Sequence, residues 1–126
     1  MLGERQNLQE QQKCLQAVHV YIRQHLDEPL NRVLLSTVAG FSVPHLHRLF
    51  ATATGESMGT AIRRMRMERA GRKLRMGAVD ITEVALAAGY ASHAAFGKAF
   101  KKRFGLTPSA FRELSCMAAT QLLRKR

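Results

Sequence analysis

The sequence predicts an all-α protein of about seven helices, in which two helix-turn-helix subdomains are joined by a long central helix. Three observations lead to this prediction. Apolar residues recur at helical spacing along most of the 126 residues, and no segment shows the alternating pattern of a strand. Glycines stand where short helices are expected to meet. The second half of the chain also repeats a pattern of the first half.

The clearest pair of helices is expected between Asp80 and Pro108. The first helix of the pair has apolar residues at i, i+3, i+4 and i+7, namely Ile81, Val84, Ala85 and Ala88. Asp80 is a capping residue, and Glu83 three positions later completes the capping-box pattern. Gly89 is expected to form a left-handed corner, because glycine adopts that conformation without steric cost.

A second helix is expected after this corner, with Ser92 as its cap and Gly105 at its end. Its apolar stripe consists of Phe96, Ala99, Phe100 and Phe104. Its other face carries His93, Lys98, Lys101, Lys102 and Arg103. A small-faced helix, a glycine corner and a basic second helix form a helix-turn-helix, a motif that lays its second helix in the major groove of DNA.

The same pattern occurs earlier in the chain. Residues 35–41 match residues 84–90 at an offset of 49, including the glycine and the aromatic residue at the corner. Residues 46–50 match residues 96–100 at an offset of 50, as Gly55 matches Gly105. The sequence therefore predicts a duplicated helix-turn-helix.

These motifs resemble the DNA-binding region of the AraC/XylS family of bacterial transcription regulators, from about Leu15 to Glu113. The most specific part is the second subdomain, with Gly89-Tyr90, Ala95-Phe96, Phe100-Lys101-Lys102-Arg103-Phe104-Gly105 and Thr107-Pro108-Ser109-Ala110-Phe111-Arg112. The first subdomain contributes Gly40-Phe41-Ser42, Leu46-His47-Arg48-Leu49-Phe50 and Thr54-Gly55-Glu56. A double pattern at this spacing is much more specific than one generic helix-turn-helix match.

The resemblance implies a site on the two second helices. In the family, the positions that match Pro44, His47 and Arg48 reach base edges, and arginine suits this role because its planar fork matches guanine O6 and N7. In the second subdomain we expect His93 and Lys98 to read bases, and Ala94, Ala95 and Gly97 to permit close approach. The residues expected to contact phosphate are Lys101, Lys102, Arg103, Arg63 and Arg64.

The expected organisation follows from these assignments. A flexible lead-in covers residues 1–12, the first subdomain 13–56, the connecting helix 57–76, the second subdomain 77–115 and a basic tail 116–126, which ends in Arg124-Lys125-Arg126. The connecting helix of about 20 residues would be about 30 Å long. It could hold two recognition helices about one DNA repeat apart, ~34 Å, so that a monomer enters successive major grooves.

The sequence departs from the family pattern at one helix, expected to start after the cap Asn31. Arg32 stands where a buried aliphatic residue is usual, and Val33 and Leu34 stand where polar residues are usual. We expect ordinary repacking here, with a surface for a partner as the alternative. A glycine inside the connecting helix, Gly71, is expected at a close helix crossing, since glycine otherwise costs up to ~1 kcal/mol there.

The net charge of +11 and the pI near 10.9 favour a polyanionic partner. Double-stranded DNA is the expected partner, together with RNA polymerase, since most of the family activates transcription; a bacterial cytoplasmic, nucleoid-associated location follows. No nucleophile–base pair, metal cluster or phosphate loop is evident, so an enzyme is the least favoured class, and no cofactor or metal is expected. Cys14 and Cys116 are expected to be reduced thiols.

Three alternatives stay open. A nonspecific or architectural nucleic-acid binder would use aromatic stacking platforms, but the phenylalanines here fall at core or corner positions. A basic amphipathic membrane binder is disfavoured by the capped short helices and glycine corners. The chain is either a stand-alone, MarA-like regulator or the DNA-binding part of a longer regulator with a ligand-binding domain that is missing here.

Overall fold

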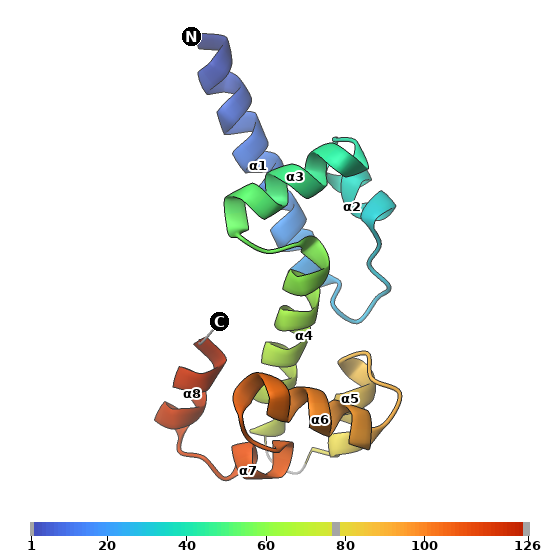
Figure 1. Cartoon of the computed structure of the whole chain (residues 1–126), viewed down its shortest axis with the longest axis vertical. Coiled ribbons are helices and arrows are strands. Elements are labelled where there is room, and N and C mark those ends of the chain that lie inside the picture. Colours follow the sequence, from blue (N-terminus) through green and yellow to red (C-terminus); the bar gives the residue numbers. More distant parts are fainter. Residues whose placement is uncertain (1, 77–78, 125–126) are drawn as a thin grey trace. The chain divides into compact units, whose positions relative to one another are not determined.

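The computed structural model describes residues 2–76 and 79–124, with side chains from residue 8 onward, and every regular element in this part of the chain is an α-helix (Figure 1). The helices are α1 (Leu2–Gln24), α2 (Arg32–Ala39), α3 (Val43–Thr54), α4 (Met58–Leu74), α5 (Ile81–Ala87), α6 (His93–Phe104), α7 (Pro108–Arg112) and α8 (Cys116–Arg124). The all-α prediction is confirmed.

The chain divides into two compact units, Met1–Arg63 and Arg64–Arg126. The boundary lies within α4, the helix that covers most of the expected connecting segment 57–76. Each unit contains one helix-turn-helix, α2–α3 in the first and α5–α6 in the second. The predicted duplication is thus present in the helices.

The beginning of the chain differs from the prediction. Residues 1–12 were expected to be a flexible lead-in, but α1 already starts at Leu2; Met1 lies outside the described residues. The physical reason is composition, because glutamine, glutamate, arginine and leucine all have good helix propensity and no proline interrupts them.

The end of the chain also differs. The segment 116–126 was expected to be a basic tail beyond about seven helices, yet residues 116–124 form α8, an eighth helix. Ser115 accepts a hydrogen bond from the backbone N–H of Ala118, and Ala119 is buried in the core of the second unit. Lys125 and Arg126, the end of the predicted basic tail, lie outside the described residues.

In the first unit, α2 and α3 pack beside α1 (Figure 1). The side chain of Asn31 caps α2 by accepting the N–H of Leu34 at 2.8 Å, as expected. The core includes Val18 and Ile22 of α1 and Phe50 of α3, all fully buried. Val33 remains 67% exposed, so the expected repacking does not cover it.

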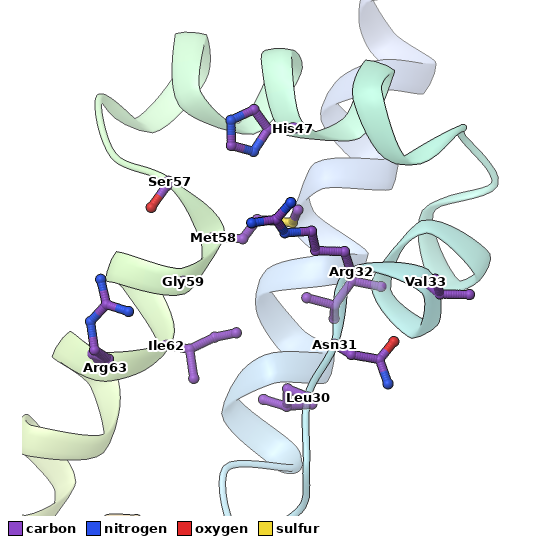
Figure 2. A pocket seen from close by; sticks show the side chains of 11 residues that line it. Leu30, Asn31, Arg32, Val33, His47, Ser57, Met58, Gly59, Ile62 and Arg63 are labelled. Carbon is purple, nitrogen blue, oxygen red and sulfur yellow. The ribbon is translucent and has the colours of Figure 1, made fainter.

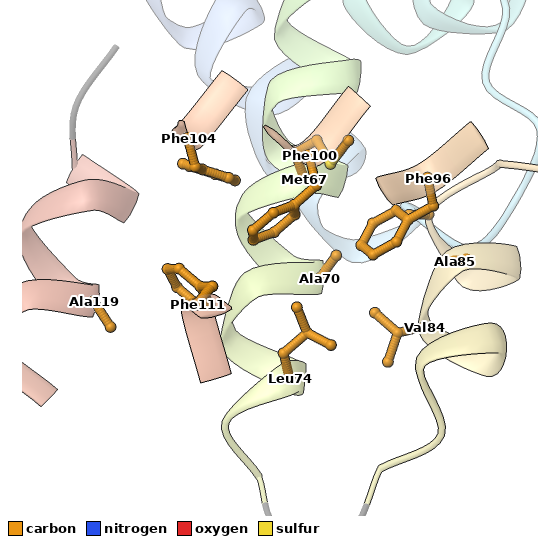
Figure 3. Close-up of a cluster of buried hydrophobic side chains, with 11 residues drawn as sticks. Met67, Ala70, Leu74, Val84, Ala85, Phe96, Phe100, Phe104, Phe111 and Ala119 are labelled. Carbon is orange, nitrogen blue, oxygen red and sulfur yellow. The ribbon is translucent and has the colours of Figure 1, made fainter. Parts of the chain in front are cut away.

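In the second unit, a ladder of aromatic rings fills the core (Figure 3). The Phe100 ring lies 5.5 Å from Phe96, 4.6 Å from Phe104 and 5.3 Å from Phe111, centroid to centroid. Rings at these separations contribute both apolar burial and favourable edge contacts. The apolar stripe predicted for α6 is therefore its buried face, which leaves the opposite face to solvent.

The corner of each helix-turn-helix depends on a glycine. Gly40 and Gly89 occupy equivalent places in the repeat, and both have positive φ, +76° and +93°. A Cβ in this left-handed region is strained, so glycine is the residue that turns the chain there at the lowest cost. The predicted left-handed corner at Gly89 is confirmed.

Arginines of the second unit hold its loops by hydrogen bonds to backbone carbonyls. Arg69 donates to the carbonyl of Ala87 at 2.9 Å, close to the turn between α5 and α6. Arg75 donates to the carbonyls of Phe111 and Arg112 at the end of α7. These two guanidiniums support the fold of the unit, so part of the large positive charge is structural.

Candidate nucleic-acid interface

The first recognition helix, α3, is oriented by its cap and its buried side chains. Ser42 accepts a hydrogen bond from the N–H of His45, while Leu46 and Phe50 are fully buried. Residues on the opposite side of a helix then face solvent. Three exposed side chains on this helix are the predicted base-contacting residues, Pro44, His47 and Arg48.

These three side chains share one hollow of about 350 Å³ in the first unit. Arg32, at the start of α2, also lines it and adds a second guanidinium beside Arg48. Arg32 was not among the site residues predicted from the sequence, although its departure from the family pattern marked the position. His45 is half-buried against Phe41, with ring centroids 4.8 Å apart.

The second recognition helix, α6, is held in the same way. Ser92 accepts the N–H of Ala95 at 3.1 Å, and Phe96 and Phe100 are fully buried. The predicted base-contacting residues on this helix are exposed or half-buried: His93, Ala94, Ala95, Gly97 and Lys98. A Cβ built on Gly97 would meet no atom within 4 Å, so packing within the chain does not require glycine there.

A groove of about 540 Å³ runs along this face of α6. It is lined by His93, Ala94, Gly97, Lys98 and Lys101 from α6 and by Thr107, Pro108 and Ser109 from the start of α7. The structure therefore brings four of the five predicted base-contacting residues of α6 together with a predicted phosphate contact. Ala95 is exposed but lies outside this lining. The contribution of α7 was missed, although Thr107-Pro108-Ser109 belongs to a motif that was recognised in the sequence.

The predicted phosphate-contacting residues fall into two groups. Lys101, Lys102 and Arg63 are exposed. Arg64 is only 10% exposed and pairs with Glu68 at 3.2 Å, one helical turn along α4. Arg103, 26% exposed, lies 3.6 Å from the same carboxylate and 5.5 Å from the Phe104 ring.

Glu68 therefore holds two of the five predicted phosphate-contacting cations within the second unit. A carboxylate that neutralises a neighbouring guanidinium reduces its attraction for an outside phosphate. The exposed lysines of α6 are better placed for that contact. The sequence showed Glu68 as the single acid among the basic residues of this helix, but not which cations it would pair with.

No helix in residues 2–76 or 79–124 is long and apolar enough to cross a membrane. Within the same ranges, no three His, Cys, Asp or Glu side chains are grouped so that they could hold a metal ion.

Two capped helix pairs, each presenting an exposed polar face on its second helix, define a double helix-turn-helix protein of the DNA-binding class. A family profile described as "Helix-turn-helix domain" matches residues 35–114. The regulatory protein SoxS of Escherichia coli (strain K12) is 35% identical over 101 residues, covering 80% of this chain and 94% of SoxS.

Solved structures agree with this result. A transcriptional regulator of the AraC type from Chromobacterium violaceum superposes with a TM-score of 0.75 and 26% identity, over 80% of this chain and 90% of that chain. The DNA-binding domain of the global transcriptional factor AdpA, solved in complex with a target DNA, gives a TM-score of 0.69 and 27% identity, over 87% and 95% of the two chains. The chain belongs to the AraC-type family of helix-turn-helix proteins and is a sequence-specific DNA-binding transcription regulator.

Proposed function

We propose that the chain binds DNA as a monomer by placing α3 and α6 in successive major grooves on one face of the duplex. The observation that carries this proposal is the repetition of one design. In both helices a serine caps the start, aromatic and aliphatic side chains hold the inner face, and polar or small residues remain on the outer face. A chain with two such helices does not need a partner copy to read two grooves.

The side chains have different roles in this proposal. Pro44, His47 and Arg48 contact base edges from α3, and the set from α6 is His93, Ala94, Ala95, Gly97 and Lys98. Arg48 supplies the strongest single base contact because its guanidinium matches two acceptors of guanine. Lys101, Lys102 and Arg63 contact phosphates. Arg64 and Arg103 contact phosphates only when their ion pairs with Glu68 are broken.

The regulatory outcome is proposed to be activation, through contact with RNA polymerase, in the nucleoid of a bacterial cytoplasm. The similarity to SoxS, a regulatory protein that matches this chain over 94% of its own length, supports a regulator of this kind. A longer protein, with a ligand-binding domain joined to this chain, is the alternative. Sequencing the transcript past the codon for Arg126 distinguishes the two.

The test is a selection of bound fragments from genomic DNA, followed by titrations of the best fragment and of mixed-sequence duplex at several salt concentrations. Neutralisation of roughly 6–10 phosphates should give a log–log salt slope of about −5 to −9 for the selected fragment. The selected fragments should share an asymmetric pair of half-sites, and the protein–DNA complex should have one chain per site. Equal affinity for both duplexes would contradict sequence-specific reading, and a palindromic site bound by two chains would contradict the monomer.

A further inference from the structure

The first unit contains an open pocket of about 690 Å³, separate from the outer face of α3 but bordering it (Figure 2). Its apolar lining comes from Leu30, Leu35, Met58 and Ile62, of which the last three are buried. Its polar lining includes Arg32, Arg63 and His47. Volumes between ~300 and 1,000 Å³ with mostly apolar walls and a few polar groups are typical of small-molecule sites.

The repeat allows the pocket of the first unit to be compared with the matching positions of the second unit. Ile62 of the first unit corresponds to Arg112 of the second, and Leu30 corresponds to Val79. Arg112 reaches across the space and donates hydrogen bonds to the carbonyls of Val79 at 2.7 Å and Leu74 at 3.1 Å. Ile62 is shorter and has no donor, so this crossing contact does not exist in the first unit.

The residue at the position of Arg32 also differs between the two units. Its counterpart, Ile81, is partly buried against the hydrophobic core of the second unit. Arg32 is exposed, and Figure 2 shows its guanidinium reaching over the pocket toward Met58, below His47. An apolar residue that packs against the core in one repeat is thus replaced by a cation on the border of the pocket in the other.

The charged side chains around the pocket indicate which class of ligand would bind there. Two guanidiniums, those of Arg32 and Arg63, lie on its border, and none of the lining residues is acidic. An isolated carboxylate is costly to remove from water unless a cation or donors receive it, and arginine is the side chain best suited to do so. The buried Met58 offers adaptable apolar contact for the remainder of a ligand, and the buried Ile62 adds a second apolar surface.

We infer that this pocket binds a small organic carboxylate with an apolar body, its anionic group on Arg32 and its body on Met58 and Ile62. Because His47 lines the pocket and also lies on the outer face of α3, a bound ligand competes with DNA. The binding itself is independent of the proposed function. Only its consequence for DNA rests on the role proposed for His47.

The isoleucines of the chain provide a direct readout, since they are Ile22, Ile62 and Ile81. In a spectrum of ¹³C-labelled Ile δ1 methyl groups, 2-naphthoate should shift the Ile62 signal in a saturable manner. The signals of Ile22, in the core of the first unit, and Ile81, in the second unit, should move much less. The uncharged 2-naphthamide should bind at least about tenfold more weakly, because it lacks the charge-assisted contact.

Matched variants test the assignment of the cation. Arg32→Gln should weaken 2-naphthoate about tenfold and leave 2-naphthamide unchanged, whereas Arg23→Gln, an equal loss of charge on the exposed face of α1, should change neither. Arg32→Ile, which introduces the residue found at the equivalent position of the second unit, should close the pocket to both compounds. The inference is overturned if Ile62 does not respond, if the amide binds as well as the acid, or if Arg23→Gln weakens binding as much as Arg32→Gln.

The effect on DNA is measured separately. With the selected DNA fragment, saturating 2-naphthoate should weaken binding several-fold, and 2-naphthamide at the same concentration should not. A shifted Ile62 signal with unchanged DNA affinity would overturn the competition while the site itself stands. Failure of the DNA selection would concern the proposed function alone, because the methyl spectra are recorded without DNA.

Discussion

Gly71 of α4 lies directly against Leu123 of α8. A Cβ added to Gly71 would come within 2.7 Å of Leu123 Cδ2 and within 3.5 Å of the Phe111 ring. Real Cβ atoms do not approach other atoms as closely as the first of these distances. The close crossing expected for this glycine is thus confirmed, and the crossing element is the segment that was expected to be a tail.

This contact predicts that the effect of Gly71→Ala on the free energy of unfolding depends on the residue at position 123. In the wild-type chain the gain in helix propensity, up to ~1 kcal/mol, is offset by displacement of Leu123. In a Leu123→Ala background the space is free, and Gly71→Ala should raise the free energy of unfolding by ~0.5–1 kcal/mol. Urea denaturation of the four proteins gives the coupling energy of this double-mutant cycle. The same gain in both backgrounds would show that the two residues do not meet.

Phe100 is expected to be the anchor of the second unit. Its ring is fully buried among Phe96, Phe104 and Phe111. Phe100→Ala should lower the free energy of unfolding by ~3–5 kcal/mol, since it removes apolar burial and leaves a cavity. Leu86→Ala, at an exposed leucine of α5, is the control and should change it by less than ~0.5 kcal/mol. A Phe100→Ala protein that unfolds like the wild type would contradict the assigned core.

Arg48 should determine base preference in one half-site. Arg48→Ala is expected to lose ~1–3 kcal/mol on the preferred DNA site and to relax base preference there, because a bidentate guanidinium contact distinguishes guanine from other bases. The second half-site should be less sharply specified from the start, because small residues on α6 offer few hydrogen bonds. A binding selection on randomised duplex measures both effects. Equally sharp half-sites in the wild type would contradict this division of roles.

Cations that are free and cations that are paired should respond differently to removal. Lys101→Ala or Lys102→Ala should weaken all DNA sequences about equally and flatten the log–log salt slope by about one unit. Arg64→Ala should flatten the slope by much less, because its guanidinium is largely buried against Glu68. It should instead lower the free energy of unfolding by ~1.5–3 kcal/mol, the range for hydrogen bonds to charged groups. Salt titrations and urea denaturation of the same proteins measure the two effects, and an equal loss of slope in all three variants would contradict the pairing.

Much of the fold could be predicted because its signals are local. Asn31 and Ser92 were identified as caps, and each accepts the expected backbone N–H. A cap acts over three residues and an apolar stripe over two turns, so both can be recognised in a short window of sequence. The sequence repeat then showed that these local signals belong to two equivalent subdomains. The match between the subdomains also indicated the outer faces of α3 and α6.

The sequence by itself therefore determined most of the helices between residues 13 and 112, the glycine corners, and the residues that α3 and α6 present to solvent. The tertiary structure alone decided which cations remain available, because the pairing of Arg103 with Glu68 joins residues 35 positions apart in the chain. It also decided that residues 116–124 form a packed helix, since Ala119 is buried in the core of the second unit and Leu123 lies beside Gly71, 52 positions earlier in the chain. The 690 Å³ pocket bordered by Arg32 was also decided by the tertiary structure, because an unfilled space depends on all the side chains around it.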